Sequence, residues 1–447
     1  MKITIIGAGP GGYETALEAA KKGIECVLVS DGPVGGTCLN EGCIPTNSLC
    51  HDAGIFRIVQ GEPDYARVLA RKEEVVSRLR GGVEFLLKNK LIKLVYGKAS
   101  FVDGHTVRVA TADGGELTET SDYIIIATGS VPASLPIPGA DLEGVIDSTA
   151  ALGLTEIPGR LCVIGAGVIG LEFASIFRSF GTEVKVLEYC REILPHFDTD
   201  MSKRLKQCLS KRGIEIETSA QVQGISRNAD GSLSVSYLKK GASESAEADK
   251  VLMAVGRRAN IASLNLADAG IEFTPRGIVV NEYMQTSVPY IYAIGDVTGG
   301  LMLAHVATFQ GYRALNHIIA GQPASGAVDN TDFSIVPAAV FTEPEAASVG
   351  LTEDECKEKG LAFEARKAFF RANGKALSTD SPDGYCKLLV DSSTGLLLGC
   401  HIFGPHASDL IHEAAVLMNA KIPIDRYRGF IHAHPTLGEV MQAAARE

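Results

Sequence analysis

The start of the chain passes from a short apolar run to a glycine-rich turn and then to a helical pattern. Residues 2–6 read KITII, which is typical of a buried strand, and the amphipathic pattern after the turn predicts a helix that ends near Lys22. Gly7, Gly9 and Gly12 lie between them in the spacing of a dinucleotide-binding turn. Glycines at these places let the backbone approach a pyrophosphate at the N-terminus of the helix. The pattern therefore predicts a nucleotide-binding strand–turn–helix unit.

A second apolar run follows this helix and ends in polar residues. Residues 25–29 read ECVLV and predict the next strand. In dinucleotide-binding units an acidic residue at the end of this strand holds a ribose diol. The acid is expected at position 30, where this chain has Ser30, and Asp31 lies one residue later. We therefore expect Asp31, with Ser30 beside it, near a ribose.

Two later apolar runs also predict strands that end in polar residues. Residues 123–127 read YIIIA and close the first nucleotide-binding domain, and residues 290–294 read YIYAI. The acid that follows the second run is expected to be exposed and suited to a sugar-like hydroxyl. The residues that follow these two runs are Thr128, Gly129, Ser130 and Asp296.

The strand–turn–helix pattern then recurs. A strand at 161–164 leads into a second glycine turn, a helix as far as Phe180, and a strand that ends at Glu188. Two such units in one chain are far more specific than one. Glu188 would accept a hydrogen bond from a ribose 2′-hydroxyl and repel a 2′-phosphate, which favours NAD, whereas the nearby Arg191 would favour NADP. The glycines of this second turn are Gly165, Gly167 and Gly170.

Between the first two strands and the third lies a CxxxxC pair, Cys38 and Cys43. On a regular helix, residues at i and i+5 have Cα atoms roughly 8–9 Å apart, and a disulfide tolerates at most about 7 Å. A bridge would therefore need a distorted helix, which Gly42 would allow. The pattern alone also fits two ordinary cysteines on a helix. A charged helical segment at 67–89 follows.

The last part of the chain follows a linker at 321–332 that is rich in glycine, proline and aspartate. Short β patterns alternate there with helices, and the chain ends near HAHPTLGE. Pro435 is predicted in the first turn of the last helix. Glu439, about a turn further on, could orient the imidazole of His434, although an isolated histidine is more often structural than catalytic.

Composition narrows the function classes. The chain has 447 residues, 46% hydrophobic and 21% charged, which indicates a globular protein of several domains. Its net charge of −11 argues against nucleic acid or an anionic membrane as partner. No apolar run approaches the roughly 20 residues that span a bilayer, and the first strand leaves no room for a signal peptide. We therefore expect a cytoplasmic protein, in which a disulfide is more often catalytic than structural.

Seven motifs taken together carry a family resemblance over nearly the whole chain. They are GGTCLNEGCIP, IIIATGS, VIGAGVIGLE, YAIGDV, MLAH, TEPEAASVGLTE and HAHPTLGE. In order and spacing they resemble the flavin-dependent pyridine-nucleotide disulfide oxidoreductases. The resemblance implies an α/β fold with two Rossmann-like domains, for FAD and NAD, and an α+β dimerisation domain. The domains expected are FAD-binding at 1–148, NAD-binding at 149–272, a central second part of the FAD domain at 273–334, and dimerisation at 335–447.

The resemblance also implies the roles of the reacting residues. Cys43 would be the thiolate beside the flavin, and Cys38 the thiol that exchanges with the substrate disulfide. His434 would be the base and Glu439 its orienting partner, and both would face the cysteines of the other subunit in a homodimer. The closest members oxidise dihydrolipoyl groups with NAD⁺, so the expected partner is a lipoyl-bearing protein of a 2-oxoacid dehydrogenase or glycine cleavage system. No metal is implied.

A wider set of residues is assigned to cofactor binding by the same resemblance, with two departures. The family usually has an acid where this chain has Ser30, and a lysine where it has Asn47. That lysine normally pairs with the glutamate that corresponds to Glu172. Besides the residues of the glycine turns and strand ends above, the assigned set comprises Gly36, Thr37, Asn47, Gly97, Glu172, Val222, Gly256, Met302, Leu303, Ala304 and His305.

Other members of the family fit less well. A mercuric reductase is expected to carry a C-terminal cysteine pair, but the last cysteine is Cys400. Glutathione-type reductases favour basic residues where Glu188 stands, and soluble transhydrogenases lack one active-site cysteine. Asn47 leaves open a weakened or differently specific disulfide reductase or diaphorase, or an FAD-binding subunit that only stabilises an assembly.

Overall fold

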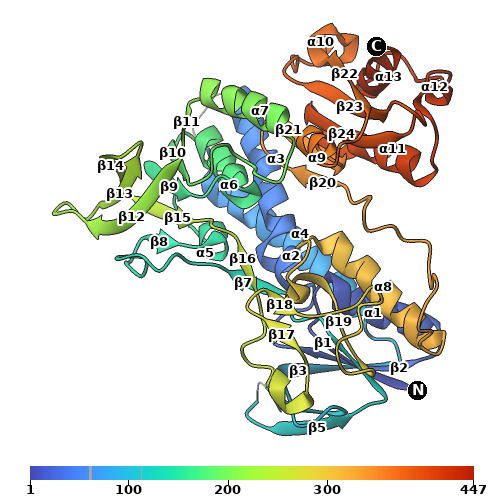
Figure 1. Cartoon of the computed structure of the whole chain (residues 1–447). Helices are drawn as coiled ribbons and strands as arrows, with labels where there is room; N and C mark the ends of the chain where they lie inside the picture. The colour runs from blue at the N-terminus through green and yellow to red at the C-terminus, as the bar shows by residue number, and fades with distance from the viewer. Residues whose placement is uncertain (60–62, 112) are drawn as a thin grey trace. The chain divides into compact units, whose positions relative to one another are not determined.

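The computed structural model describes residues 1–59, 63–111 and 113–447. The chain forms two compact units, each assembled from separate stretches (Figure 1). Unit 1 comprises Met1–Ser48, Arg67–Ala133 and Arg257–Thr331, and unit 2 comprises Leu49–Ala66, Ser134–Gly256 and Asp332–Glu447. Within the described ranges, no helix is long and apolar enough to cross a membrane.

Unit 1 is built on a seven-stranded sheet in the order β19-β6-β1-β2-β3-β4-β5. The first five strands of this order are parallel, and β3, β4 and β5 pair antiparallel. The strands are β1 (Lys2–Ile6), β2 (Glu25–Ser30), β3 (Ile92–Phe101), β4 (Thr106–Thr111), β5 (Glu116–Thr120), β6 (Tyr123–Ile126) and β19 (Ile291–Ala293). The predicted strands at 2–6, 25–29 and 123–127 are thus confirmed, with small differences at their ends.

Both faces of this sheet are buried, which explains why its strands are almost continuously apolar. Ile3 and Ile5 of β1 pack with the small residues of helices α1 (Pro10–Lys21) and α8 (Ala304–Ile319) on one face. Ile6 and its neighbours on β2 and β6 form a second cluster on the other face. The predicted helix at 67–89 is α4, which begins at Tyr65 and ends at Leu86.

In unit 2 the second nucleotide-binding pattern forms a parallel sheet in the order β11-β10-β9-β15-β8. Its strands are β8 (Val145–Ile146), β9 (Arg160–Ile164), β10 (Glu183–Glu188), β11 (Ile214–Thr218) and β15 (Lys250–Met253). Its helices are α5 (Ser148–Leu152), α6 (Val168–Ser179) and α7 (Thr199–Lys211). An antiparallel sheet of β12 (Ala220–Arg227), β13 (Leu233–Lys239) and β14 (Ala242–Ala248) is inserted before β15.

The C-terminal part of unit 2 is an antiparallel sheet in the order β20-β21-β24-β23-β22 with its own apolar core. The strands are β20 (Ala338–Val340), β21 (Glu345–Gly350), β22 (Phe363–Phe369), β23 (Tyr385–Asp391) and β24 (Leu397–Gly404). The helices are α9 (Glu353–Glu358), α10 (Gly374–Ser378), α11 (Ala407–Asn419), α12 (Ile424–Tyr427) and α13 (Glu439–Arg446).

The remaining elements are short. Two small ladders pair β7 (Ser130–Pro132) with β16 (Arg257–Ala259), and β17 (Phe273–Thr274) with β18 (Gly277–Ile278). Three 3₁₀ turns are η1 (Leu266–Ala269), η2 (Gly295–Thr298) and η3 (Phe370–Ala372). The cysteine stretch forms α2 (Gly36–Glu41) and α3 (Cys43–Val59).

Candidate active site

The helix that carries Cys38 begins directly against the first glycine turn. The Gly35 amide donates a hydrogen bond to the Ala8 carbonyl (2.8 Å). Gly36, the first residue of α2, has φ +56°, and a Cβ there would lie 2.6 Å from the Gly9 Cα. Only glycine permits this approach. The first cysteine is therefore anchored to the turn that the sequence predicts for a dinucleotide.

A break in the helix separates the two cysteines. α2 ends at Glu41, Gly42 has φ −146° and ψ −111°, and α3 starts at Cys43. The interruption expected at Gly42 is thus confirmed, and the spacing of a continuous helix no longer applies. Both cysteines are free thiols in this structure, with Cys38 half-buried and Cys43 exposed.

The two thiols share one hydrogen bond, and it polarises the pair. The Cys38 thiol donates to the Cys43 sulfur, which lowers the pKa of Cys43, while exclusion of water opposes this effect. The same hydrogen bond, together with burial, raises the pKa of Cys38. Arg257 also favours the Cys43 thiolate. These effects favour the thiolate on Cys43 and the protonated thiol on Cys38, and a thiolate is the reactive form in disulfide exchange.

Three residues from different strand ends are linked within unit 1. The Ser130 hydroxyl donates to the Asp296 carboxylate (2.5 Å), and Arg257 Nε donates to the Ser130 Oγ (2.7 Å). Arg257 Nη2 also donates to the Ser130 carbonyl (2.8 Å). Asp296 is half-buried in η2, so the expectation of an exposed acid was wrong. Its burial follows from the 3₁₀ turn, which folds the acid back onto Ser130.

Arg257 was missed by the sequence reasoning. It follows Gly256, which the family resemblance singled out, and it stands in the pair Arg257-Arg258 that begins a short strand. Nothing local in the sequence indicates that this strand pairs with residues 130–132, a contact between distant parts of the chain. The basic pair after Gly256 was the available signal.

The second glycine turn holds Glu188 in a fixed orientation. Glu188 is 7% exposed, and its two carboxylate oxygens accept hydrogen bonds from the amides of Ala166 (2.6 Å) and Cys190 (2.7 Å). Each oxygen keeps a further lone pair that could accept from a hydroxyl group. A buried anion without a basic partner in these contacts would repel a phosphate. The arrangement suits a ribose diol.

Other predicted cofactor residues are placed as follows. The buried Ser30 donates its hydroxyl to the Gly32 carbonyl (2.8 Å), and Asp31 is exposed beside it. The Asn47 amide donates back along α3 to the Cys43 carbonyl (3.0 Å). Glu172, buried on α6 in unit 2, accepts from the Phe341 amide (3.0 Å).

The remaining members of that set are spread over both units. In unit 1 they lie on α2 (Thr37), on β3 (Gly97), between β6 and β7 (Thr128, Gly129) and at the start of α8 (Met302, Leu303, Ala304, His305). In unit 2 they lie on β12 (Val222) and after β15 (Gly256). Their joint role in cofactor binding is a prediction from the family resemblance.

His434 and Glu439 form a pair near the C-terminus, in unit 2. His434 Nδ1 lies 3.0 Å and 3.2 Å from the two Glu439 oxygens. The Thr436 amide, donating at 2.8 Å, is the main cause of a lowered pKa of Glu439, and His434 adds to it. The His434 side chain is 76% exposed, so its other nitrogen faces solvent. A carboxylate on Nδ1 leaves Nε2 able to take a proton.

The prediction for Pro435 was wrong. The last helix, α13, begins at Glu439, and Pro435 precedes it in a turn. The turn is held by the Thr436 side chain, which donates to the Ala433 carbonyl (2.8 Å), and by the bond from the Thr436 amide to Glu439. Glu439 thus satisfies a backbone donor ahead of the helix and brings its carboxylate to His434.

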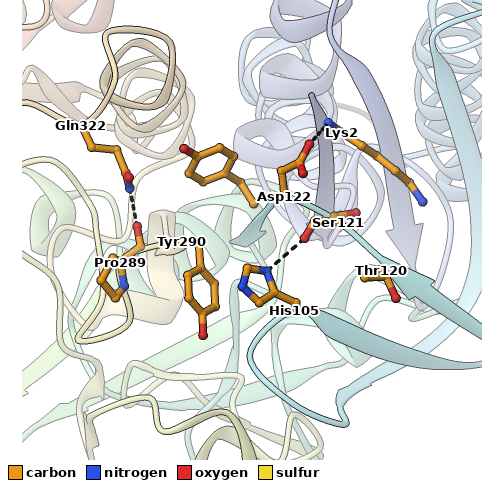
Figure 2. A pocket seen from close by; sticks show the side chains of 9 residues that line it. Lys2, His105, Thr120, Ser121, Asp122, Pro289, Tyr290 and Gln322 are labelled. Atoms are coloured by element: carbon orange, nitrogen blue, oxygen red, sulfur yellow. Dashed lines mark hydrogen bonds between the residues drawn. The ribbon is translucent and has the colours of Figure 1, made fainter.

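A hollow of about 600 Å³ lies elsewhere on unit 1 (Figure 2). Its lining includes Lys2 and Tyr123 at the beginnings of their strands, and His105 stacked on Tyr290 with ring centroids 3.7 Å apart. The glycine turn follows the end of β1 and Asp296 follows β19. The hollow therefore lies at the N-terminal ends of the parallel strands, whereas the cysteine pair lies at their C-terminal ends.

Among the described residues, no cluster of three or more His, Cys, Asp or Glu side chains could hold a metal.

Known proteins match this chain over almost its whole length. Residues 336–445 match the dimerisation domain of the pyridine nucleotide-disulphide oxidoreductases. A dihydrolipoyl dehydrogenase of Geobacillus stearothermophilus is 41% identical, and the match covers 99% of this chain and 94% of that protein. A dihydrolipoyl dehydrogenase of Bacillus subtilis is 43% identical, and the match covers 99% of this chain and 95% of that protein.

Solved structures of flavoprotein disulfide reductases and related proteins are also similar. The structure of the HOCl-induced flavoprotein disulfide reductase RclA from Escherichia coli has a TM-score of 0.89 and 32% sequence identity, and the match covers 100% of this chain and 99% of that one. LpdA from Mycobacterium tuberculosis has TM-score 0.91 and 26% identity, covering 100% and 99%. Residues 1–311 match the pyridine nucleotide-disulphide oxidoreductase model itself, and the chain belongs to this family.

Proposed function

We propose that the chain is a dihydrolipoyl dehydrogenase, which oxidises dihydrolipoyl groups to the cyclic disulfide with NAD⁺. The observation that carries the proposal is the Cys38–Cys43 pair, anchored on the first glycine turn with its negative charge on Cys43. Relatives of that name, about 40% identical over the full length, support the substrate. As in the rest of the family, the cofactors are FAD and NAD(H).

The residues of unit 1 fit FAD. At Gly12 a Cβ would lie 1.8 Å from the Gly7 carbonyl oxygen, so the turn is closed by glycines and its helix N-terminus is open to a pyrophosphate. Ser130, Asp296 and Arg257 supply a hydroxyl, a carboxylate and a guanidinium within one linked group. FAD held by these residues would supply the two-electron redox chemistry that links the cysteine pair to NAD⁺. Glu188 and the second glycine turn fit the ribose and pyrophosphate of NAD⁺ in the same way.

The chain's own residues supply the thiol chemistry. In the oxidised pair, a substrate thiolate attacks the Cys38 sulfur, which forms a mixed disulfide and releases Cys43 as the thiolate. The second substrate thiol gives its proton to His434 Nε2 and then attacks the substrate sulfur of the mixed disulfide. This attack closes the lipoyl disulfide, which leaves, and it releases Cys38 as a thiolate that takes up a proton. The substrate loses two electrons and two protons, and the cysteine pair gains the two electrons. Glu439 holds the imidazole in the tautomer that can accept the proton.

The assembly follows from the same assignment. The match to a dimerisation domain supports a homodimer, and we place His434 and Glu439 of one subunit opposite the cysteine pair of the other. The macromolecular partner is a lipoyl-bearing protein of a 2-oxoacid dehydrogenase or glycine cleavage system in the cytoplasm. The domain limits at 148, 272 and 334 remain those proposed from the sequence.

The decisive experiment is a steady-state assay of purified, FAD-loaded protein with NAD⁺ and a panel of dithiols. We expect dihydrolipoamide to be oxidised with the highest kcat/KM and to bleach the flavin absorbance in the absence of NAD⁺. If another dithiol bleaches the flavin and dihydrolipoamide does not, the proposed substrate is wrong, whereas the proposed class of reaction stands. Full flavin occupancy without bleaching by any dithiol would contradict the proposal and favour a subunit that only stabilises an assembly.

A further inference from the structure

A row of polar side chains crosses the antiparallel sheet of unit 2. Ser348, His401, Lys387 and Lys367 stand directly opposite one another on the adjacent strands β21, β24, β23 and β22. Because they are in register, their side chains lie on one face of the sheet. Lys387 and His401 are 0% exposed. A buried lysine in an apolar sheet requires a partner, because an unpaired buried charge is strongly destabilising.

The partner is Asp198, the N-cap residue directly before α7, in the nucleotide-binding part of unit 2. Lys387 Nζ lies 3.0 Å and 2.9 Å from the two oxygens of Asp198, and 2.5 Å from a Glu353 oxygen. Asp198 caps α7 by accepting from the Met201 amide (3.2 Å), and it also accepts from the Glu353 amide (3.2 Å). The ion pair therefore fixes the start of α7 to the C-terminal sheet.

Asp198 is also the last residue of the loop that follows Glu188 and leads into α7. At its beginning, the loop gives the Cys190 amide to the Glu188 carboxylate (2.7 Å). In its middle, the Leu194 amide donates to the carbonyl of Ala166 in the second glycine turn (3.0 Å). The loop and the start of α7 line an open hollow of about 190 Å³. The loop is thus tied to Glu188 at its beginning, to the nucleotide-binding turn in its middle, and to Lys387, through Asp198, at its end.

We propose that Asp198 and Lys387 are positioning residues for NAD(H), so that the C-terminal sheet sets nucleotide affinity through a loop that it fixes. One of the two amides that orient the Glu188 carboxylate belongs to this loop. Release of Asp198 leaves the loop end unfixed, and Glu188 and Ala166 lose their defined places. This proposal rests on the use of NAD(H) in the proposed function. It adds residues that determine NAD(H) affinity, and one of them, Lys387, lies in a different sheet from the one that carries the glycine turn.

The test uses the FAD-loaded full chain with Asp198→Asn and Lys387→Met combined. This variant removes both buried charges, and asparagine retains the oxygen that caps α7. The matched control is Arg366→Met, which removes an ion pair with Glu364 (2.7 Å) within β22 of the same sheet and leaves α7 and its loop untouched. Binding of ADP-ribose, which cannot accept hydride, is measured by calorimetry alongside KM for NAD⁺, KM for dihydrolipoamide, kcat and thermal unfolding.

We expect the double variant to raise the Kd for ADP-ribose and KM for NAD⁺ about tenfold, as misplacement of a binding loop does. KM for dihydrolipoamide and kcat should stay within about twofold of wild type, as should every constant of the control. A folded double variant with wild-type ADP-ribose affinity would overturn the proposal, and so would an equal loss in the control. If the double variant does not fold, the single variant Asp198→Asn replaces it, because Lys387 then keeps its partner Glu353. Wild-type ADP-ribose affinity in that single variant would likewise overturn the proposal. Failure of wild type to bind ADP-ribose would instead overturn the use of NAD(H).

Discussion

At the scale of residues, one hydrogen bond favours the thiolate on one of the two cysteines of the proposed active site. The donor is the Cys38 thiol and the acceptor is Cys43. The sequence allowed the prediction that both cysteines react, since they lie in a motif of the family. It did not reveal Arg257, because the contact of that residue with Ser130 joins positions far apart in the chain. Local pattern points to the cysteines proposed to react, whereas the charged groups around them depend on long-range pairing.

The first prediction concerns the pH at which the Cys43 thiolate forms. In the folded dithiol protein the pKa of Cys43 is lowered, so removal of the donor in Cys38→Ala should raise it. The thiolate should then appear at higher pH than in wild type, because the hydrogen bond that favours the charged form is lost. Thiolate absorbance near the ultraviolet edge, titrated with the other cysteines in place, measures the change, and Cys26→Ala is the control. An unchanged or lower midpoint would contradict the role of Cys38.

The second prediction concerns Asn47, whose amide is bonded to its own helix and brings no charge. Asn47→Lys places a cation one turn after Cys43, at the position where the family usually has lysine. Reduced flavin is largely anionic at neutral pH, and a cation 6–8 Å away would stabilise it by about 2–3 kcal/mol at an effective dielectric constant near 20. We therefore expect the flavin midpoint potential to rise. Potentiometric titration of both proteins checks this, and an unchanged or lower potential in the variant would contradict it.

At the scale of elements, regular repeats were predictable and irregular connections were not. The strands of both nucleotide-binding units were located because buried parallel strands are short, apolar and followed by glycine turns. The last helix was placed too early, because proline suits the first turn of a helix and the competing turn around Thr436 has no strong local signal. The register of the C-terminal sheet, which brings Lys387 between His401 and Lys367, also depends on contacts that periodicity does not encode.

The third prediction tests the packing of α2 on the glycine turn. Gly36→Ala would place a Cβ 2.6 Å from the Gly9 Cα in a backbone conformation that favours glycine, so α2 must move. We expect loss of bound FAD and a stability decrease of about 1–3 kcal/mol. Flavin content after desalting and thermal unfolding measure both. The control is Gly54→Ala in α3, where no atom lies within 4 Å of the added Cβ and alanine favours the helix. Full flavin retention in Gly36→Ala would show that the turn can adapt.

At the scale of the whole molecule, the proposed shared site makes each subunit incomplete. The cysteine pair belongs to unit 1 and the His434–Glu439 pair to unit 2. The histidine pair lies within residues 336–445, which match the family's dimerisation domain, and this match is the reason for proposing that it faces another copy. Sequence motifs locate both halves of the site but carry no information on which subunit supplies each.

The fourth prediction follows from this arrangement. Cys38→Ser and His434→Ala should each be inactive alone, and mixed dimers should contain one intact site. Random exchange makes half of the dimers mixed, so about a quarter of wild-type activity should return. Exchange is verified by differently tagged chains that co-purify. Demonstrated exchange without return of activity would place His434 in the same subunit as its cysteine pair or outside the reaction.

The interleaving of the two units has a consequence for synthesis on the ribosome. Strand β6, whose core reads YIII, pairs on one side with β1 but on the other with β19, and β19 begins only at Ile291. While the intervening stretch of unit 2 is being translated, the β6 edge of the first sheet remains open. An uncovered apolar edge strand is a template for pairing with other chains. Nascent chains that stall before residue 291 should therefore be the most dependent on chaperones, and they should recover once β19 emerges to complete the sheet.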